Sequence, residues 1–163
     1  MNLRSRTLPP LALLLFSLAC LNPAASAASP DHWVGTWAAA PVAQANPDAK
    51  IGSADTTFRE IVHVSIGGPA IRVILTNELG HDSLTVGAAG VALSAGGSAI
   101  NPSAAGALTF NGRPSVTIPP GALVVSDPVS LKLPPSSDLA VSIFVPAQTI
   151  SQVTQHSFAD QIS

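Results

Sequence analysis

The chain has 163 residues, of which 47% are hydrophobic and only 10% are charged. Seven basic and nine acidic residues give a formal net charge of −2, which excludes a nucleic-acid binder that works by neutralising a run of phosphates. The high apolar content also excludes an acidic disordered chain, and the length fits one domain.

The first 27 residues have the pattern of a secretory signal peptide. Arg4 and Arg6 give a positive start, Leu11–Leu21 is apolar apart from one serine, and residues 25–27 read Ala-Ser-Ala, the small-residue pattern of a cleavage site. The apolar run is shorter than the roughly 20 residues that span a bilayer, although an uncleaved anchor remains an alternative. We therefore expect cleavage after Ala27, a secreted protein (extracellular or periplasmic) and no transmembrane span.

Cys20 is the single cysteine of the chain, and it lies inside this leader. Cleavage after Ala27 leaves residues 28–163 without a disulfide, a thiolate metal site or a cysteine nucleophile. Lipoprotein processing in front of Cys20 is an alternative, because small and apolar residues precede it. The mature fold is expected to rest on a packed core alone.

The mature chain is expected to contain strands and no helix. Its Ala-rich segment 38–50 is the best helix candidate, but Pro41 and Pro47 interrupt it, and an interior proline costs a helix about 3 kcal/mol. Residues 56–66 form the clearest strand, whose apolar face Glu60 interrupts near its start. The Gly-Gly pair at 67–68 predicts a tight hairpin turn into a returning strand at 70–76.

Turn signals divide the rest of the chain into short strands. Segment 84–93 changes its apolar parity across Gly87 and Gly90, which predicts a bulge. Segment 96–106 is expected to be a long surface loop, and Asn111-Gly112 predicts a hairpin that joins 107–110 to 115–118. Further strands are expected at 122–126, 129–133 and 139–145. About eight short strands predict an all-β fold over residues 28–163, an antiparallel β-sandwich or jelly-roll-like domain.

Ser83 lies in the most conspicuous chemical motif of the chain. The run Asp-Ser-Leu at 82–84 is close to a serine esterase nucleophile block, but His81 stands where that block has its glycine. The residues after Ser83 are strand-like, whereas a helix N-terminus would help to hold the oxyanion. A triad also needs a base and an orienting acid. We therefore interpret Ser83 as part of a polar turn between two strands.

Histidines and carboxylates give no metal motif. The four histidines, His32, His63, His81 and His156, have no metal-ligand spacing, and His63 is interpreted as a plain surface residue. A calcium site built from scattered carboxylates remains an alternative, with Asp48, Asp55 and Asp82 as candidates. No cofactor, metal site or catalytic residue is assigned.

Trp33 and Trp37 bracket the run Trp-Val-Gly-Thr-Trp, and aromatic residues make up only 4% of the chain. We interpret both rings as sealing one end of the core, with stacking on sugar rings as the alternative. Two arginines, Arg59 and Arg72, are expected to pair with Glu60 or Glu78 across strands, for a few tenths of a kcal/mol at a surface.

Several segments, taken in order, resemble the N-terminal region of secreted SGNH (GDSL-type) esterases. These segments are 32–38 (HWVGTWA), 58–68 (FREIVHVSIGG), 71–80 (IRVILTNELG), 84–89 (LTVGAA), 108–121 (LTFNGRPSVTIPPG), 125–129 (VSDPV), 138–146 (DLAVSIFVP) and the tail at 155–157 (QHS). Together they extend over essentially the whole mature chain.

The resemblance implies an accessory β-sandwich or jelly-roll domain that precedes a catalytic α/β domain. In this family the catalytic domain hydrolyses esters, often acyl or acetyl groups on carbohydrates or lipids, with a Ser-Asp-His triad. The nucleophile, Gly-x-Asn-Asp and Asp-x-x-His blocks have no counterpart up to Ser163, so we expect a truncated chain that is inactive alone. Its expected partner is the downstream catalytic domain, and a docking surface would be an exposed apolar patch of more than about a few hundred Å². The alternative is a free-standing exported module that binds carbohydrate.

Overall fold

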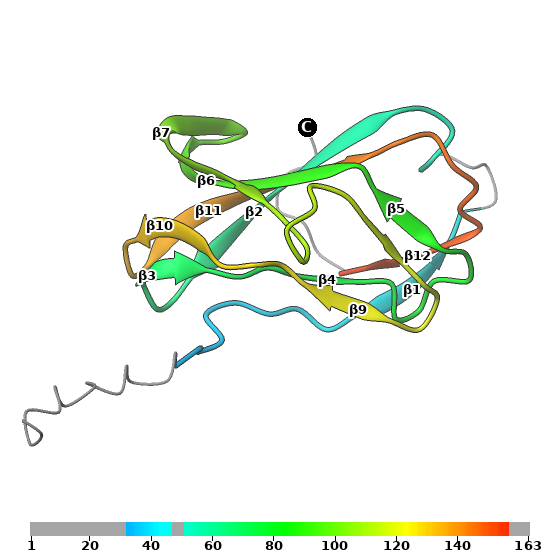
Figure 1. Cartoon of the computed structure of the whole chain (residues 1–163), viewed down its shortest axis with the longest axis horizontal. Helices are drawn as coiled ribbons and strands as arrows, with labels where there is room; N and C mark the ends of the chain where they lie inside the picture. Colours follow the sequence, from blue (N-terminus) through cyan, green and yellow to red (C-terminus); the bar gives the residue numbers. More distant parts are fainter. Residues whose placement is uncertain (1–31, 47–50, 157–163) are drawn as a thin grey trace, which may run out of the picture. The chain divides into compact units, whose positions relative to one another are not determined.

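A computed structural model describes residues 32–46 and 51–156. The expected signal peptide, Cys20, Asp48 and the end of the QHS tail lie outside the described residues. The chain divides into two compact units, Met1–Val34 and Gly35–Ser163, and the architecture below is that of the second unit. Twelve strands and no helix occur in the described part of the chain (Figure 1), which confirms the expected all-β class.

The largest sheet has four antiparallel strands. Its order is β2-β11-β6-β7, built from β2 (Thr56–Val64), β11 (Ser137–Val145), β6 (Ala88–Gly96) and β7 (Ala99–Leu108). The pairing of β2 with β11 aligns Val64 with Ser137 at one end and Thr56 with Val145 at the other. The strand that was clearest in the sequence is thus the edge strand β2.

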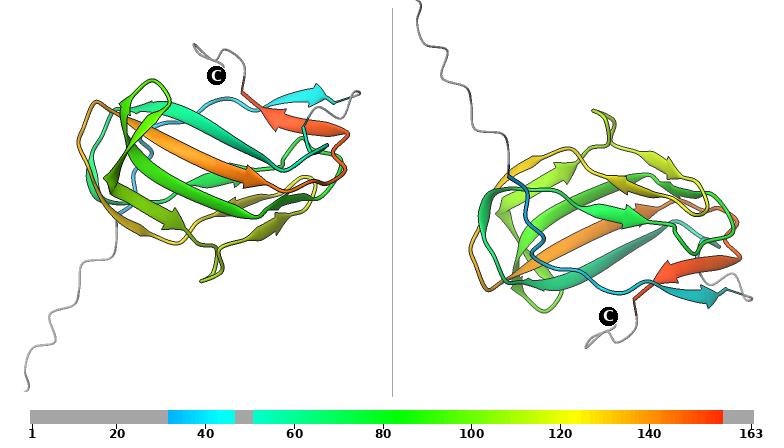
Figure 2. Two further views of the ribbon diagram at one scale, coloured as in Figure 1. Left: turned by 90° about the horizontal axis from the view of Figure 1, so that it is seen from above. Right: turned by 90° about the horizontal axis from the view of Figure 1, so that it is seen from below.

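Four two-stranded antiparallel sheets complete the architecture. They pair β1 (Val42–Ala45) with β12 (Gln152–Gln155), β3 (Gly68–Ile71) with β10 (Val129–Leu133), β4 (Ile74–Thr76) with β9 (Leu123–Val125), and β5 (Leu84–Val86) with β8 (Val116–Ile118). Both β1 and β12 are strands that the sequence did not predict. Figure 2 shows these two strands side by side, although they come from opposite ends of the chain.

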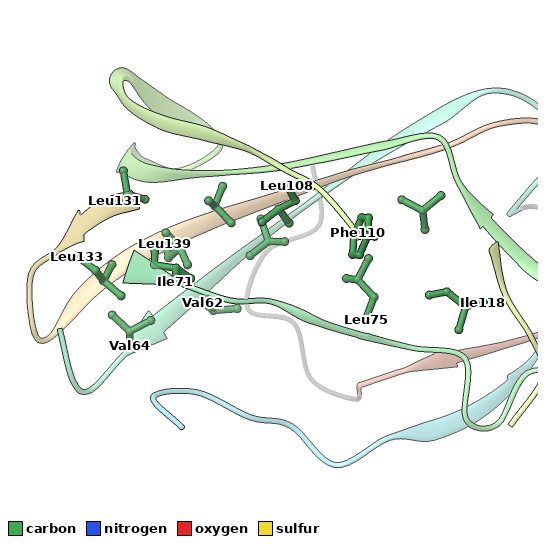
Figure 3. Close-up of a cluster of buried hydrophobic side chains, with 13 residues drawn as sticks. Val62, Val64, Ile71, Leu75, Leu108, Phe110, Ile118, Leu131, Leu133 and Leu139 are labelled. Carbon is green, nitrogen blue, oxygen red and sulfur yellow. The ribbon is translucent and has the colours of Figure 1, made fainter. Parts of the chain in front are cut away.

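One buried cluster joins the four-stranded sheet to the β3–β10, β4–β9 and β5–β8 sheets (Figure 3). Its largest fully buried side chains are Leu108, Ile118, Val64 and Val86. Alternation explains the membership, because Val62 and Val64 face the core while His63 between them is exposed. Each fully buried aliphatic side chain stabilises the fold by about 1.5–3 kcal/mol.

The Gly-Gly pair at 67–68 does not form a hairpin turn, contrary to the sequence prediction. Neither glycine has a positive φ, and β2 pairs with β11 whereas β3 pairs with β10. The pair instead carries the chain from one sheet to another. A Cβ at Gly67 would lie 2.4 Å from the Leu133 carbonyl oxygen, so close backbone approach explains this glycine.

The segments 84–93 and 96–106 also differ from their predictions. Gly87 breaks the first segment into β5 and β6, and a Cβ there would lie 2.8 Å from the Phe144 ring. The register shifts come later, between Ala92 and Ser94 and between Ser94 and Gly96. The second segment is not a loop, because it forms most of β7 and pairs with β6. The small residues of this segment are thus accommodated in an edge strand of the four-stranded sheet.

The Asn111-Gly112 turn is confirmed, but its flanking strands are not. Both residues have positive φ, 52° and 74°, as a two-residue hairpin turn of the primed type requires. The ladder ends after one bridge, between Phe110 and Arg113. Beyond it, β7 pairs with β6 and β8 pairs with β5, so the turn joins two different sheets.

Candidate functional site

Ser83 is exposed and precedes β5 directly. Its neighbour Asp82 accepts hydrogen bonds from the Ser151 amide (2.7 Å) and the Ser151 hydroxyl (2.5 Å). These two bonds hold the pKa of Asp82 below its ordinary value, the hydroxyl contributing most. Asp82 therefore fastens the turn to the segment before β12, which agrees with the interpretation of Ser83 as part of a polar turn.

The histidines are placed apart. His32 and His81 are exposed, and His63 is exposed on β2 with its Nδ1 2.8 Å from Asp138 Oδ1. His156 follows β12, and its Nε2 lies 3.4 Å from Glu60 Oε2. Asp55, the remaining described calcium candidate besides Asp82, accepts the Ala147 amide hydrogen at 2.9 Å. No group of three His, Cys, Asp or Glu side chains placed to hold a metal ion occurs within residues 32–46 and 51–156.

The tryptophans do not seal the core, contrary to the preferred interpretation. Trp33 is 40% exposed and Trp37 is 42% exposed. Thr36, the residue before Trp37, is held by hydrogen bonds to the segment after β2. The Thr36 hydroxyl donates to the Ile66 carbonyl at 2.7 Å and accepts the Ile66 amide hydrogen at 2.8 Å.

The expected Arg–Glu pairing across strands is wrong for Arg59. Its Nε donates to the Ser142 hydroxyl at 3.0 Å and its Nη1 donates to the Ser98 carbonyl at 2.7 Å. Glu60, on the opposite face of β2, contacts His156. Alternation of side chains along a strand puts Arg59 and Glu60 on different faces, which explains the difference.

Asn77 is a buried hub that the sequence did not single out. Its side chain is almost fully buried, and its Nδ2 donates to the carbonyls of Asp82 (2.8 Å) and Ile118 (3.0 Å). Its own carbonyl accepts the amide hydrogens of Gly80 and Gly121. Asn77 therefore joins three loops at one end of the molecule. A lone asparagine after a strand carries no signal for such a role.

A second polar hub centres on Asp127. Its carboxylate accepts hydrogen bonds from the Gly112 amide (2.7 Å), the Thr109 hydroxyl (2.7 Å) and the Asn111 amide (3.2 Å). These bonds, led by the Gly112 amide and helped by the charge of Arg72, hold the pKa of Asp127 below its ordinary value. The carboxylate therefore organises the turn at Asn111-Gly112.

Three large aliphatic side chains are exposed together on the ribbon of β4 and β9. Ile74 is 61% exposed, Leu123 57% and Val125 43%. Ile74 and Val125 are direct cross-strand partners, and Leu123 lies opposite Thr76. These three residues, named here the ribbon patch, form the kind of apolar surface that marks an interaction site when it is uncovered.

The outer face of the four-stranded sheet has a shallow hollow of about 420 Å³. Most of the residues that line it are small, including Gly90, Ala92 and Ser142, and the larger Arg59 and Ile100 also line it. Small side chains leave the backbone close to the surface.

No protein-family model matches this chain, and no curated protein matches it either. In the described part of the chain there is no helix long and apolar enough to cross a membrane.

Proposed function

We propose that this chain is the non-catalytic N-terminal domain of a secreted SGNH/GDSL-type serine esterase. In this proposal the domain is a β-sandwich of the jelly-roll kind, exported by the signal peptide at residues 1–27. A downstream catalytic domain, its partner, hydrolyses acyl or acetyl esters of carbohydrates or lipids. The segment order given above is the starting point of the proposal.

The observation that supports the proposal most is that polar residues in the esterase-like segments make structural hydrogen bonds. Three different esterase-like segments contain Thr36, Asn77 and Asp127. The side chain of each of these residues makes hydrogen bonds that hold loops and turns in place. A catalytic group must keep a lone pair or a proton free for the substrate. The segments that resemble the esterases therefore supply architecture here, which is what an accessory domain requires.

The exposed ribbon patch supports the proposal that a partner domain docks on this chain. Isolated aliphatic residues on a surface need no explanation, but Ile74 and Val125 are paired directly and Leu123 is on the same ribbon. Exposure of this group in water costs free energy that docking would recover, at about 25 cal/mol per Å² buried. A catalytic domain packed on this ribbon would provide that cover.

The proposal is tested by assaying the purified chain with fluorogenic acetyl and butyryl esters. We expect no turnover above that of the buffer. The variant Ser83→Ala is the matched comparison, since turnover that vanishes in this variant would make the chain a small hydrolase and contradict the proposal. Restoring a downstream catalytic domain on the same polypeptide is expected to give an active esterase.

The second candidate is a free-standing exported carbohydrate-binding module. The exposure of Trp33 and Trp37 favours it, because exposed tryptophan rings offer apolar faces on which sugar rings stack. Retention of the chain on an insoluble polysaccharide, without any esterase domain encoded downstream, would bring this candidate ahead of the first.

A further inference from the structure

Three side chains from separate segments meet beside the edge strand β2. Trp37 belongs to the segment that leads into β1, Glu60 lies on β2, and His156 follows the end of β12. The ring centroids of Trp37 and His156 are 5.7 Å apart with the planes at 79°, an edge-to-face contact. The other side of the imidazole places Nε2 3.4 Å from Glu60 Oε2. The views in Figure 2 show the end of β12 near the chain segment that enters β1.

Glu60 is a charged residue at a position of β2 where the alternation of side chains predicts a buried apolar residue. It has the same parity as Val62 and Val64, which are buried, and it lies opposite Val141 in the register with β11. Yet its side chain is 44% exposed, although Val141 opposite it is buried in the core. Its carboxylate therefore interrupts the apolar face of β2 and is accessible to solvent.

The carboxylate also keeps accepting capacity. An ionised carboxylate has about four lone-pair sites. Among the described residues, its partner is His156 at 3.4 Å, a distance longer than the 2.7–3.2 Å of a good N–H···O hydrogen bond. The Trp37 ring is 42% exposed at the same place. An acceptor, a histidine ring and an apolar aromatic surface are thus all open to one ligand.

We propose that Trp37, Glu60 and His156 form a subsite for one sugar ring. The C–H face of the ring would lie on the exposed indole, two neighbouring hydroxyls would donate to the Glu60 carboxylate, and the imidazole would exchange a hydrogen bond with a third. Binding sites of this kind combine an apolar surface with a few placed polar groups. The inference goes beyond the accessory role, because it assigns a ligand to this domain itself.

The chain contains an internal control for this subsite. His63 and Asp138 form a second exposed histidine–carboxylate pair, 2.8 Å apart, on β2 and β11. Its closer spacing satisfies both groups, and no ring contact to His63 is found in residues 32–46 and 51–156. The two pairs share the acid–imidazole chemistry and differ in the aromatic surface, so they separate sugar recognition from a general charge effect.

The experiment measures depletion of the chain from solution by insoluble cellulose, chitin and xylan, and follows tryptophan fluorescence with the matching soluble oligosaccharides. The variant Trp33→Phe leaves Trp37 as the single tryptophan reporter, since the chain has two. We expect binding to at least one polysaccharide, with a blue shift of Trp37 emission. Trp37→Ala is expected to weaken binding by about tenfold or more, and Glu60→Gln by roughly three- to tenfold.

His63→Gln and Asp138→Asn are expected to bind as the wild type does, and unchanged thermal unfolding shows that each variant is folded. Trp37→Phe, which keeps an aromatic ring, replaces Trp37→Ala if the latter unfolds, and it is expected to bind more weakly than the wild type. Absence of binding to all three polysaccharides, or equal binding by folded Trp37 and Glu60 variants, would overturn the subsite. Either result would leave the accessory-domain proposal intact, because that proposal is tested by esterase activity.

Discussion

The Gly112 amide donates a 2.7 Å hydrogen bond to the Asp127 carboxylate, fifteen positions further along the chain. Gly112 has a positive φ of 74°, which glycine adopts without steric cost. The Asp127 carboxylate therefore binds a turn in which glycine already favours the positive φ that the turn needs. Since the turn lies between β7 and β8, and Asp127 lies between β9 and β10, this bond links the turn to the segment that joins β9 to β10.

Replacing the carboxylate tests this link. Asp127→Ala removes the acceptor of three hydrogen bonds and is expected to lower Tm, whereas Asp127→Asn, which keeps one oxygen, is expected to lower it less. Amide exchange at Gly112, measured by NMR, is expected to become faster in both variants. The matched control is Asp138→Ala, on an exposed pair, which should leave Tm close to the wild-type value. Equal Tm in the Asp127 and Asp138 variants would contradict the link.

Two carboxylates predict the acid sensitivity of the fold. The pKa values of Asp82 and Asp127 are both lowered, mainly by hydrogen bonds from Ser151 and from Gly112 respectively. A lowered folded pKa means that the contribution to stability is present above the unfolded pKa, near 3.9, and is lost as the pH falls through the folded pKa.

We therefore expect urea midpoints to fall between pH 5 and pH 2. The double variant Asp82→Asn with Asp127→Asn is expected to start lower and to change less over the same range. A double variant whose midpoint falls as steeply as that of the wild type would show that other groups carry the acid response.

The sequence predicted the class of fold because the evidence for it is local. Alternating apolar residues and turn signals mark strands such as Thr56–Val64 and Val129–Leu133 without knowledge of their partners. Pairing was less predictable, since the glycines at 67–68 are compatible with a hairpin turn as well as with close approach to the Leu133 carbonyl. The first and last strands were not predicted, because their pairing is not visible in the sequence. Val42–Ala45 is recognisable as a strand only from its pairing with Gln152–Gln155.

The polar residues were predicted less well than the strands. Asp82 was noticed for its motif, but its role depends on Ser151, 69 positions away. Asn77 and Asp127 carry no motif at all, and their hydrogen bonds are made to turns that only the fold brings near them. Glu60 was recognised as a carboxylate that interrupts an apolar strand face, but an arginine was the predicted partner, whereas the structure places His156 beside it.

Asn77 is expected to be the most sensitive polar residue. Asn77→Ala would leave the carbonyls of Asp82 and Ile118 without their donor, and each orphaned buried group costs about 1–3 kcal/mol. We expect a loss of about 3 kcal/mol in the free energy of unfolding, measured with urea. Asn101→Ala, at an exposed position on β7, is the control and should stay within about 0.5 kcal/mol of the wild type. A similar small effect at Asn77 would contradict its role as a hub.

A pair of leucines separates the core from the ribbon patch. Leu108 is 1% exposed, whereas Leu123 is 57% exposed. Leu108→Ala is expected to lower the free energy of unfolding by about 2–5 kcal/mol, because it leaves a cavity in the buried cluster. Leu123→Ala should change the stability of the isolated chain by less than about 0.5 kcal/mol. A large destabilisation by Leu123→Ala would mean that the ribbon patch belongs to the core and is no docking surface.

The accessory-domain proposal is tested most directly by the genomic DNA sequence immediately after codon 163, translated in all three frames. The account predicts a Gly-Asp-Ser block followed by a hydrophobic residue, and then Gly-x-Asn-Asp and Asp-x-x-His blocks at later positions. A stop codon at this point with no such blocks in any frame would contradict the proposal, and the exported carbohydrate-binding module would then take its place.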